Sequence, residues 1–157
     1  IHNARDYVYI TTPYLVLDNE MITTLTRVAK SGVEVSIIMP HIPDKWYAFA
    51  VAKTYYKELI EGGVRIYEYE PGFVHAKVFV ADDDTASVGT INLDYRSLYL
   101  HFECGAFIYN NSEIDRIERD FQETLEKCHK VTLMEVKNRS LLTKIVGQVL
   151  KLVAPLM

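Results

Sequence analysis

Apolar and polar residues follow two different periods in the first half of the chain. Alternation at period two and short apolar runs predict strands at residues 5–12, 33–39 and 64–69. Helical spacing of the apolar residues predicts two helices between these strands, at residues 19–31 and 44–61. This strand–helix–strand–helix–strand order favours a largely parallel sheet with helices packed against it.

The second half of the chain is richer in strands. We expect strands at residues 75–81, 85–89 and 102–109, with an Asp-rich turn between the first two. A helix then follows from its expected N-cap, Ser112, with an apolar stripe that extends to Cys128. Together with the first half, this pattern predicts an α/β fold with a mixed, largely parallel sheet flanked by helices.

We assign residues 1–138 to this one domain and residues 139–157 to a basic amphipathic C-terminal tail. The apolar positions of the tail recur at helical spacing, at Leu142, Ile145, Val149 and Leu152. Such a helix fits the interface of an anionic membrane, and it also fits a contact with the missing half of the protein. Buried amphipathic helices are commoner, so the pattern favours packing.

Composition narrows the class of protein. With 157 residues, of which 49% are hydrophobic, the chain suits one globular domain. No apolar run reaches the ~18 residues that a membrane-spanning helix needs, so we expect this piece to be soluble. Cys104 and Cys128 lie far apart without C-x-x-C spacing, which indicates two reduced core thiols and a cytosolic location.

Charge is divided unevenly along the chain. The net charge is −4, but residues 1–128 carry twelve Lys or Arg and twenty Asp or Glu, a balance of −8. Residues 129–157 carry five Lys or Arg and one Glu, a balance of +4. An acidic body repels a phosphate backbone, so we expect no nucleic-acid partner. The basic tail instead matches an anionic membrane surface.

His75 and Lys77 are the first candidates for chemistry. Side chains alternate along a strand, so these two would point to one face while Ala76 and Val78 enter the opposite, apolar layer. Taken alone, the pair is better explained as two polar residues on an exposed strand edge. The spacing of the residues that follow changes this interpretation.

Residues 75–92 form a long gapped pattern. Four residues separate Lys77 from Asp82, and six separate Asp82 from the sequence Gly89-Thr90-Ile91-Asn92. The pattern resembles the H-x-K-x(4)-D-x(6)-G-S-x-N signature of the phospholipase D superfamily, called the HKD motif, with Thr90 in place of the usual Ser. Because threonine keeps the hydroxyl, the resemblance implies an active site on a phospholipase D-like fold.

The residue types suit the transfer of a phosphodiester. His75, with an ordinary pKa of about 6.5, can act as nucleophile or proton donor near neutral pH. Lys77 supplies positive charge for the phosphoryl oxygens, with the Thr90 hydroxyl and the Asn92 amide beside it. Asp82 completes the catalytic set that the motif implies. Such a site needs neither a metal ion nor another cofactor, and we interpret the acids next to Asp82 as ordinary turn residues.

The resemblance also singles out Glu103. In single-motif nucleases of the superfamily, a carboxylate on a later strand hydrogen-bonds the catalytic imidazole, which fixes its tautomer. Glu103 lies at the matching distance after the motif. A surface glutamate is the alternative, and the sequence leaves both open.

Beyond the motif, the chain is similar to bacterial cardiolipin synthases, and specifically to their second, C-terminal HKD half. The similarity rests on segments spread over nearly the whole chain, at residues 12–14, 33–40, 63–69, 71–77, 92–97 and 154–156. The chain departs from the family at Leu17, where many relatives have proline.

This resemblance implies a phosphatidyltransferase that joins two phosphatidylglycerol molecules into cardiolipin and releases glycerol. One histidine would carry the phosphatidyl group as a phosphohistidine, and the histidine of a second HKD copy would protonate the leaving glycerol. The expected partners are phosphatidylglycerol, an anionic membrane surface, and the other HKD half of the same protein or a second subunit. The expected location is the cytoplasmic face of the cell membrane.

Two other functions are open at this point. A homodimeric HKD phosphodiesterase or nuclease would explain one motif in a chain of this length, although the acidic charge counts against it. An inert isolated half would serve only to bind lipid or its partner, because one histidine cannot complete a two-histidine mechanism.

Overall fold

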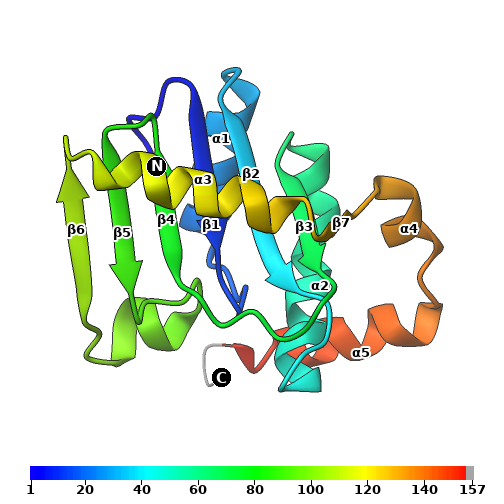
Figure 1. Cartoon of the computed structure of the whole chain (residues 1–157). Coiled ribbons are helices and arrows are strands. Elements are labelled where there is room, and N and C mark those ends of the chain that lie inside the picture. Colours follow the sequence, from blue (N-terminus) through cyan, green and yellow to red (C-terminus); the bar gives the residue numbers. More distant parts are fainter. Residues whose placement is uncertain (155–157) are drawn as a thin grey trace.

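The computed structural model describes residues 1–154 as seven strands, five α-helices and one π-helical turn (Figure 1). The strands are β1 (Tyr7–Thr11), β2 (Glu34–Pro40), β3 (Arg65–Tyr69), β4 (Val78–Ala81), β5 (Thr85–Gly89), β6 (Gly105–Tyr109) and β7 (Cys128–Lys130). The helices are α1 (Asn19–Lys30), α2 (Trp46–Glu61), α3 (Glu113–Leu125), α4 (Leu133–Asn138) and α5 (Leu141–Lys151), and the π-helical turn is η1 (Arg96–Leu100).

The strands form one sheet in the order β6-β5-β4-β1-β2-β3-β7. β1, β2 and β3 run parallel and are connected through α1 and α2, as the alternating sequence pattern predicts. The other four pairings are antiparallel. The predicted mixed α/β sheet flanked by helices is therefore confirmed, and its parallel part consists of three strands.

Helices cover both faces of the sheet. α3 crosses one face, and α1 and α2 lie on the other (Figure 1). The larger part of the core, which includes Ile37 and Tyr55, lies between the sheet and α1 and α2. A smaller cluster with Ile38 and Phe121 lies beneath α3. The neighbours Ile37 and Ile38 thus enter opposite layers, as the alternation of side chains along a strand requires.

Aspartate residues stabilise the start of α1 and the turn between β4 and β5. The carboxylate of Asp18 accepts a hydrogen bond from the backbone N–H of Met21 at 2.7 Å and caps α1. In the β4–β5 hairpin, Asp82 and Asp83 have φ angles of 52° and 57°. Two successive left-handed residues are typical of a type I′ turn, and aspartate tolerates this conformation better than most residues.

Some predicted details of the second half are wrong. Cys128 is not part of the α3 stripe, because α3 ends at Leu125 and the chain then reverses to pair Cys128 with Tyr69 of β3. Ser112 is the N-cap of α3 as expected, but its side chain makes no capping hydrogen bond, and the side-chain oxygen of Asn111 accepts from the Glu113 N–H at 2.9 Å instead. Both cysteines are free, but Cys104 is exposed and does not lie in the core.

Most of the tail forms α5, which packs against α2, as does α4 immediately before the tail. Its four predicted stripe positions are nevertheless exposed, at Leu142, Ile145, Val149 and Leu152. Residues 1–154 therefore do not cover this stripe, which we expected to be packed. Residues 155–157 of the tail lie outside the described part of the chain. None of the helices in residues 1–154 has both the length and the apolar composition needed to cross a membrane.

Candidate active site

His75 and Lys77 lie in the extended segment between β3 and β4, at the end of the sheet where β1 stops and β4 begins. The strand expected at residues 75–81 is observed only from Val78 onwards, as β4, so both His75 and Lys77 precede it. The Nζ of Lys77 donates a hydrogen bond to the carbonyl oxygen of His75 at 2.6 Å. The Lys77 carbonyl accepts from the Gly89 N–H at 3.2 Å, which ties the segment to the end of β5.

The His75 imidazole lies against two aromatic rings and remains exposed to solvent. The ring of Phe73 is 5.3 Å away between centroids, and Tyr14 approaches edge-on at 6.4 Å. Tyr14 is held in turn by Asp44, whose carboxylate accepts its hydroxyl proton at 2.5 Å. The rings limit how the imidazole can turn while its polar edge stays accessible to a ligand.

Partial burial and the positive charge of Lys77 lower the pKa of His75 below its ordinary value of 6.5. Lys45 acts in the same direction, and the carboxylate of Asp44 opposes them. At neutral pH the imidazole is therefore largely neutral. A neutral imidazole can attack phosphorus or accept a proton from a hydroxyl group.

Thr90 and Glu103 form a pair beside Lys77. The Thr90 hydroxyl donates to the Glu103 carboxylate, and its oxygen accepts from the Cys104 N–H at 2.9 Å. Hydrogen bonds from Thr90 and Ser97 lower the pKa of Glu103, so that it is ionised near neutral pH. Its negative charge opposes the lowering of the Lys77 pKa that partial burial causes.

Two expected roles differ in this geometry. Within residues 1–154, Glu103 contacts Thr90 and makes no hydrogen bond to His75, so the predicted orienting contact is not formed. A threonine hydroxyl has one proton, and here it goes to Glu103. Thr90 therefore holds a carboxylate, rather than presenting the phosphate-binding donor that the sequence predicts.

Asn92 lines a cavity of about 390 Å³ next to this pair. Its side-chain N–H donates to the Ser97 hydroxyl at 3.0 Å, and its buried Oδ1 has no hydrogen-bond partner within residues 1–154. An amide nitrogen has two protons, so one remains for a ligand. The cavity is also lined by Tyr14, Val16, Lys45, Tyr47, Ala48, Asp94, Arg96, Ser97 and His101.

The sequence did not assign roles to Tyr14, Ser97 or His101. Tyr14 and Ser97 fall within segments that resemble cardiolipin synthases, at residues 12–14 and 92–97, and that resemblance was the available signal. Neither segment has a spacing that predicts contact with residues 75–77. The fold brings them together because β1 pairs with β4 and because Leu15 forms a β-bridge with Leu93.

Asp82 lies at the opposite end of β4 from His75 and Lys77. Its carboxylate accepts hydrogen bonds from the backbone N–H groups of residues 5, 6 and 7, at 2.7, 2.9 and 2.9 Å. Partial burial alone would raise the pKa of Asp82, but these three bonds outweigh it, and the pKa is lowered. The predicted catalytic role does not match this position, because Asp82 anchors the segment that leads into β1.

Comparisons with known proteins agree with the motif. A family model described as "Cardiolipin synthase, PLD-like domain" matches residues 1–125. Over all 157 residues the chain is 55% identical to an uncharacterized protein of Streptococcus mutans and 39% identical to cardiolipin synthase 2 of Bacillus anthracis. It covers 34% and 30% of these proteins, and thus spans about a third of their length.

Among solved structures, the fold is similar to that of Nuc, a phospholipase D family member from Salmonella typhimurium. The TM-score is 0.70, over 83% of this chain and 84% of that chain. The sequence identity is 17%, so this similarity concerns the fold alone.

Proposed function

The chain belongs to the PLD-like domain family of cardiolipin synthases, and we propose that it supplies one of two HKD motifs to a phosphatidyltransferase that forms cardiolipin from two phosphatidylglycerol molecules. The observation that carries this proposal is the exposed His75 imidazole beside the Lys77 ammonium. All 157 residues of the chain that carries them are similar to part of a cardiolipin synthase. Because the chain spans about a third of that relative, the activity is proposed for a protein that also contains a second HKD motif.

In the first half-reaction, a histidine nitrogen attacks the phosphorus of phosphatidylglycerol. The N–P bond forms while the bond between phosphorus and the glycerol oxygen breaks. The second histidine donates a proton to that oxygen, so glycerol leaves as a neutral molecule. The first histidine then carries the phosphatidyl group.

In the second half-reaction, the histidine that gave up its proton takes one from the terminal hydroxyl of another phosphatidylglycerol. The resulting alkoxide character lets this oxygen attack the phosphohistidine. The P–O bond forms, the N–P bond breaks, and cardiolipin leaves with the enzyme restored. Each motif supplies one histidine, and His75 is the one supplied by this chain.

Lys77 is suited to hold the non-bridging phosphate oxygens. Its ammonium lies at the exposed surface of the site and bonds to a carbonyl oxygen of its own segment. A phosphate oxygen carries more negative charge than a carbonyl, so it would replace this partner when the lipid binds. The remaining amide proton of Asn92 would bind a second oxygen.

His101 is the histidine that lines the cavity beside Asn92, and we do not assign it the second catalytic role. Its ring is half exposed and lies 3.9 Å from Glu103, and the residues beside it in the chain provide no lysine for a phosphate. The exposure of His75 leaves room for a second HKD motif to approach from outside residues 1–154.

The substrate class is tested with the full-length protein and vesicles that contain phosphatidylglycerol. We expect cardiolipin and glycerol to form in equal amounts. Phosphatidic acid as the main lipid product would identify a phospholipase that uses water as acceptor. Cleavage of plasmid DNA without lipid turnover would favour the nuclease alternative and contradict the proposal.

A further inference from the structure

α5 presents an exposed apolar face on the outside of the molecule. Seven large apolar side chains in and just after this helix are exposed, with Leu142 at 72% and Leu152 at 82%. The others are Leu141, Ile145, Val146, Val149 and Val153. A contiguous apolar face of this kind marks a surface that contacts another apolar phase or partner.

The orientation of this face is fixed by the opposite side of α5. Gly147 is buried against α2, where a Cβ would lie 2.8 Å from the Cγ2 of Thr54 and 2.9 Å from the carbonyl oxygen of Ala50. Only glycine allows this close approach. Lys151 also lies on the inner side, with its Nζ 4.1 Å from the centre of the Tyr55 ring. Rotation of the apolar face towards the core would break both contacts.

A basic hollow of about 280 Å³ lies between α2, α4 and α5. Among residues 1–154, its lining contains five cationic side chains and no carboxylate, and the cations are Lys53, Lys57, Lys137, Arg139 and Lys144. Two of them have ion-pair partners outside the hollow, at Glu68 and Glu61. The other three form no ion pair within residues 1–154. The hollow is therefore electrostatically suited to an anion.

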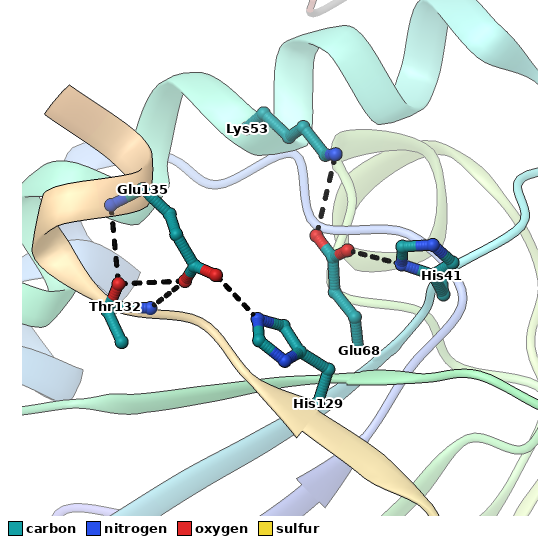
Figure 2. A network of polar contacts seen from close by, with 6 residues as sticks. All are labelled: His41, Lys53, Glu68, His129, Thr132 and Glu135. Atoms are coloured by element: carbon teal, nitrogen blue, oxygen red, sulfur yellow. Dashed lines mark hydrogen bonds and ion pairs between the residues drawn. The ribbon is translucent and has the colours of Figure 1, made fainter. Parts of the chain in front are cut away.

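Polar contacts hold the walls of the hollow in place (Figure 2). Glu68 binds both His41 at 2.9 Å and Lys53 at 3.6 Å. These contacts hold the Lys53 side chain in place at the wall of the hollow. At the start of α4, Thr132 and Glu135 form a capping box, and Glu135 also binds His129 at 2.8 Å. The short helix that carries Lys137 is thus anchored at its N-terminal end.

Charge and position point to one occupant. After Glu135 the chain contains Lys137, Arg139, Lys144 and Lys151 and no acidic residue, whereas the rest of the chain is acidic. Lysine is depleted at the cores of protein interfaces, while cations beside an apolar helix face are typical of helices that lie in an anionic membrane interface. α5 also lies towards the same end of the sheet as the segment that carries His75 (Figure 1).

We propose that the apolar face of α5 and the basic hollow beside it form a docking surface for an anionic phospholipid bilayer. The apolar side chains enter the interface, and the hollow binds the phosphate of a lipid headgroup. The inference deepens the proposed function, since a membrane bound here would lie at the end of the domain where a lipid must reach His75. It concerns binding alone and does not depend on turnover.

The test is sedimentation of the 157-residue chain with vesicles of phosphatidylcholine alone and with vesicles that also contain phosphatidylglycerol. We expect at least about 10-fold tighter binding to the anionic vesicles, weakened by salt. Leu142→Ser with Val149→Ser, and separately Lys137→Gln with Lys144→Gln, should each weaken binding about 10-fold or more. Both pairs are exposed, so the fold is retained.

Matched controls lie on other faces. Phe107→Ser on β6, and Arg119→Gln with Lys127→Gln on the α3 side, remove the same kinds of exposed group and should leave binding unchanged. Sedimentation measures binding without turnover, so a failure of the catalytic proposal does not affect this test. Equal binding to both vesicle types, or full binding by the two α5 and hollow variants, would overturn the inference.

Discussion

The ammonium of Lys77 donates a hydrogen bond to the carbonyl oxygen of His75 at 2.6 Å, two residues away in the same extended segment. The same charge lowers the pKa of the His75 ring. Lys77 is therefore held close to the imidazole before any ligand binds. A phosphate that displaces the carbonyl would arrive within reach of both groups.

Lys77→Met in the full-length protein should abolish phosphatidyl transfer, because the stem is kept and the charge is lost. Lys77→Arg should recover little, since a wide planar guanidinium cannot replace a compact ammonium. If the Lys77 ammonium stabilises the negative charge that develops on the phosphoryl oxygens, no metal ion is needed, and a chelator should leave the wild-type rate unchanged. A strict requirement for added magnesium together with an active Lys77→Met variant would refute this account of the site.

Asp44 and Lys45 should shift the pH dependence of transfer in opposite directions. For a His75 that attacks phosphorus, the lowered pKa places the acid limb of the rate profile below pH 6.5, because activity falls as the imidazole becomes protonated. Lys45→Met removes a cation and should move this limb to higher pH. Asp44→Asn removes an anion and should move it to lower pH.

Each of these shifts should be on the order of a few tenths of a pH unit, since both groups are exposed and screened. The measurement is kcat/KM against pH for the wild type and the two variants. Shifts in the same direction would exclude the electrostatic cause.

Thr90→Val should lower kcat by about 5- to 30-fold, because it removes the hydrogen bond that holds Glu103 and lowers its pKa. Thr90→Ser keeps the hydroxyl and should restore most of the rate. Thr85→Val is the matched control, since Thr85 also donates to a carboxylate but lies at the start of β5, at the opposite end of that strand from Thr90. An equal loss of rate in both valine variants would indicate a general structural effect.

Asp82→Asn should lower stability rather than remove the chemistry. The three backbone N–H groups lose a charged acceptor, at a cost of about 1–3 kcal/mol in the free energy of unfolding. Asparagine tolerates the left-handed φ of 52° at this position, so the turn itself is kept. The transfer rate of the folded variant at moderate temperature should stay near that of the wild type.

The pH dependence of this stability follows from the lowered pKa. The contribution of Asp82 is fully present above the ordinary aspartate pKa of about 3.9 and is lost as pH falls through the lowered folded value. Denaturant unfolding of wild type and Asp82→Asn between neutral pH and about pH 2 tests this. The two curves should converge at the acid end. A folded Asp82→Asn protein without activity would restore Asp82 to the catalytic set.

The sequence predicted the first half of the fold well, because the order from β1 to β3 depends on local periodicity. The motif spacing singled out His75 and Lys77, but it placed them within a strand that in fact begins only at Val78. It could not reveal what Asp82 does, since that depends on backbone groups 75 or more positions away in the chain. Cys128 was misplaced for a similar reason, because helical spacing continues past Leu125 while pairing with Tyr69 decides the structure.

The central claim is that the imidazole of His75 takes part in phosphatidyl transfer. The most direct measurement is cardiolipin formation from phosphatidylglycerol vesicles by full-length His75→Ala, with circular dichroism to show that the fold is intact. His101→Ala, which removes the histidine that lines the neighbouring cavity, is the matched control. We predict a loss of at least about 10²–10⁴-fold for His75→Ala and near wild-type activity for His101→Ala. Cardiolipin formation near the wild-type rate by a folded His75→Ala protein would contradict the account.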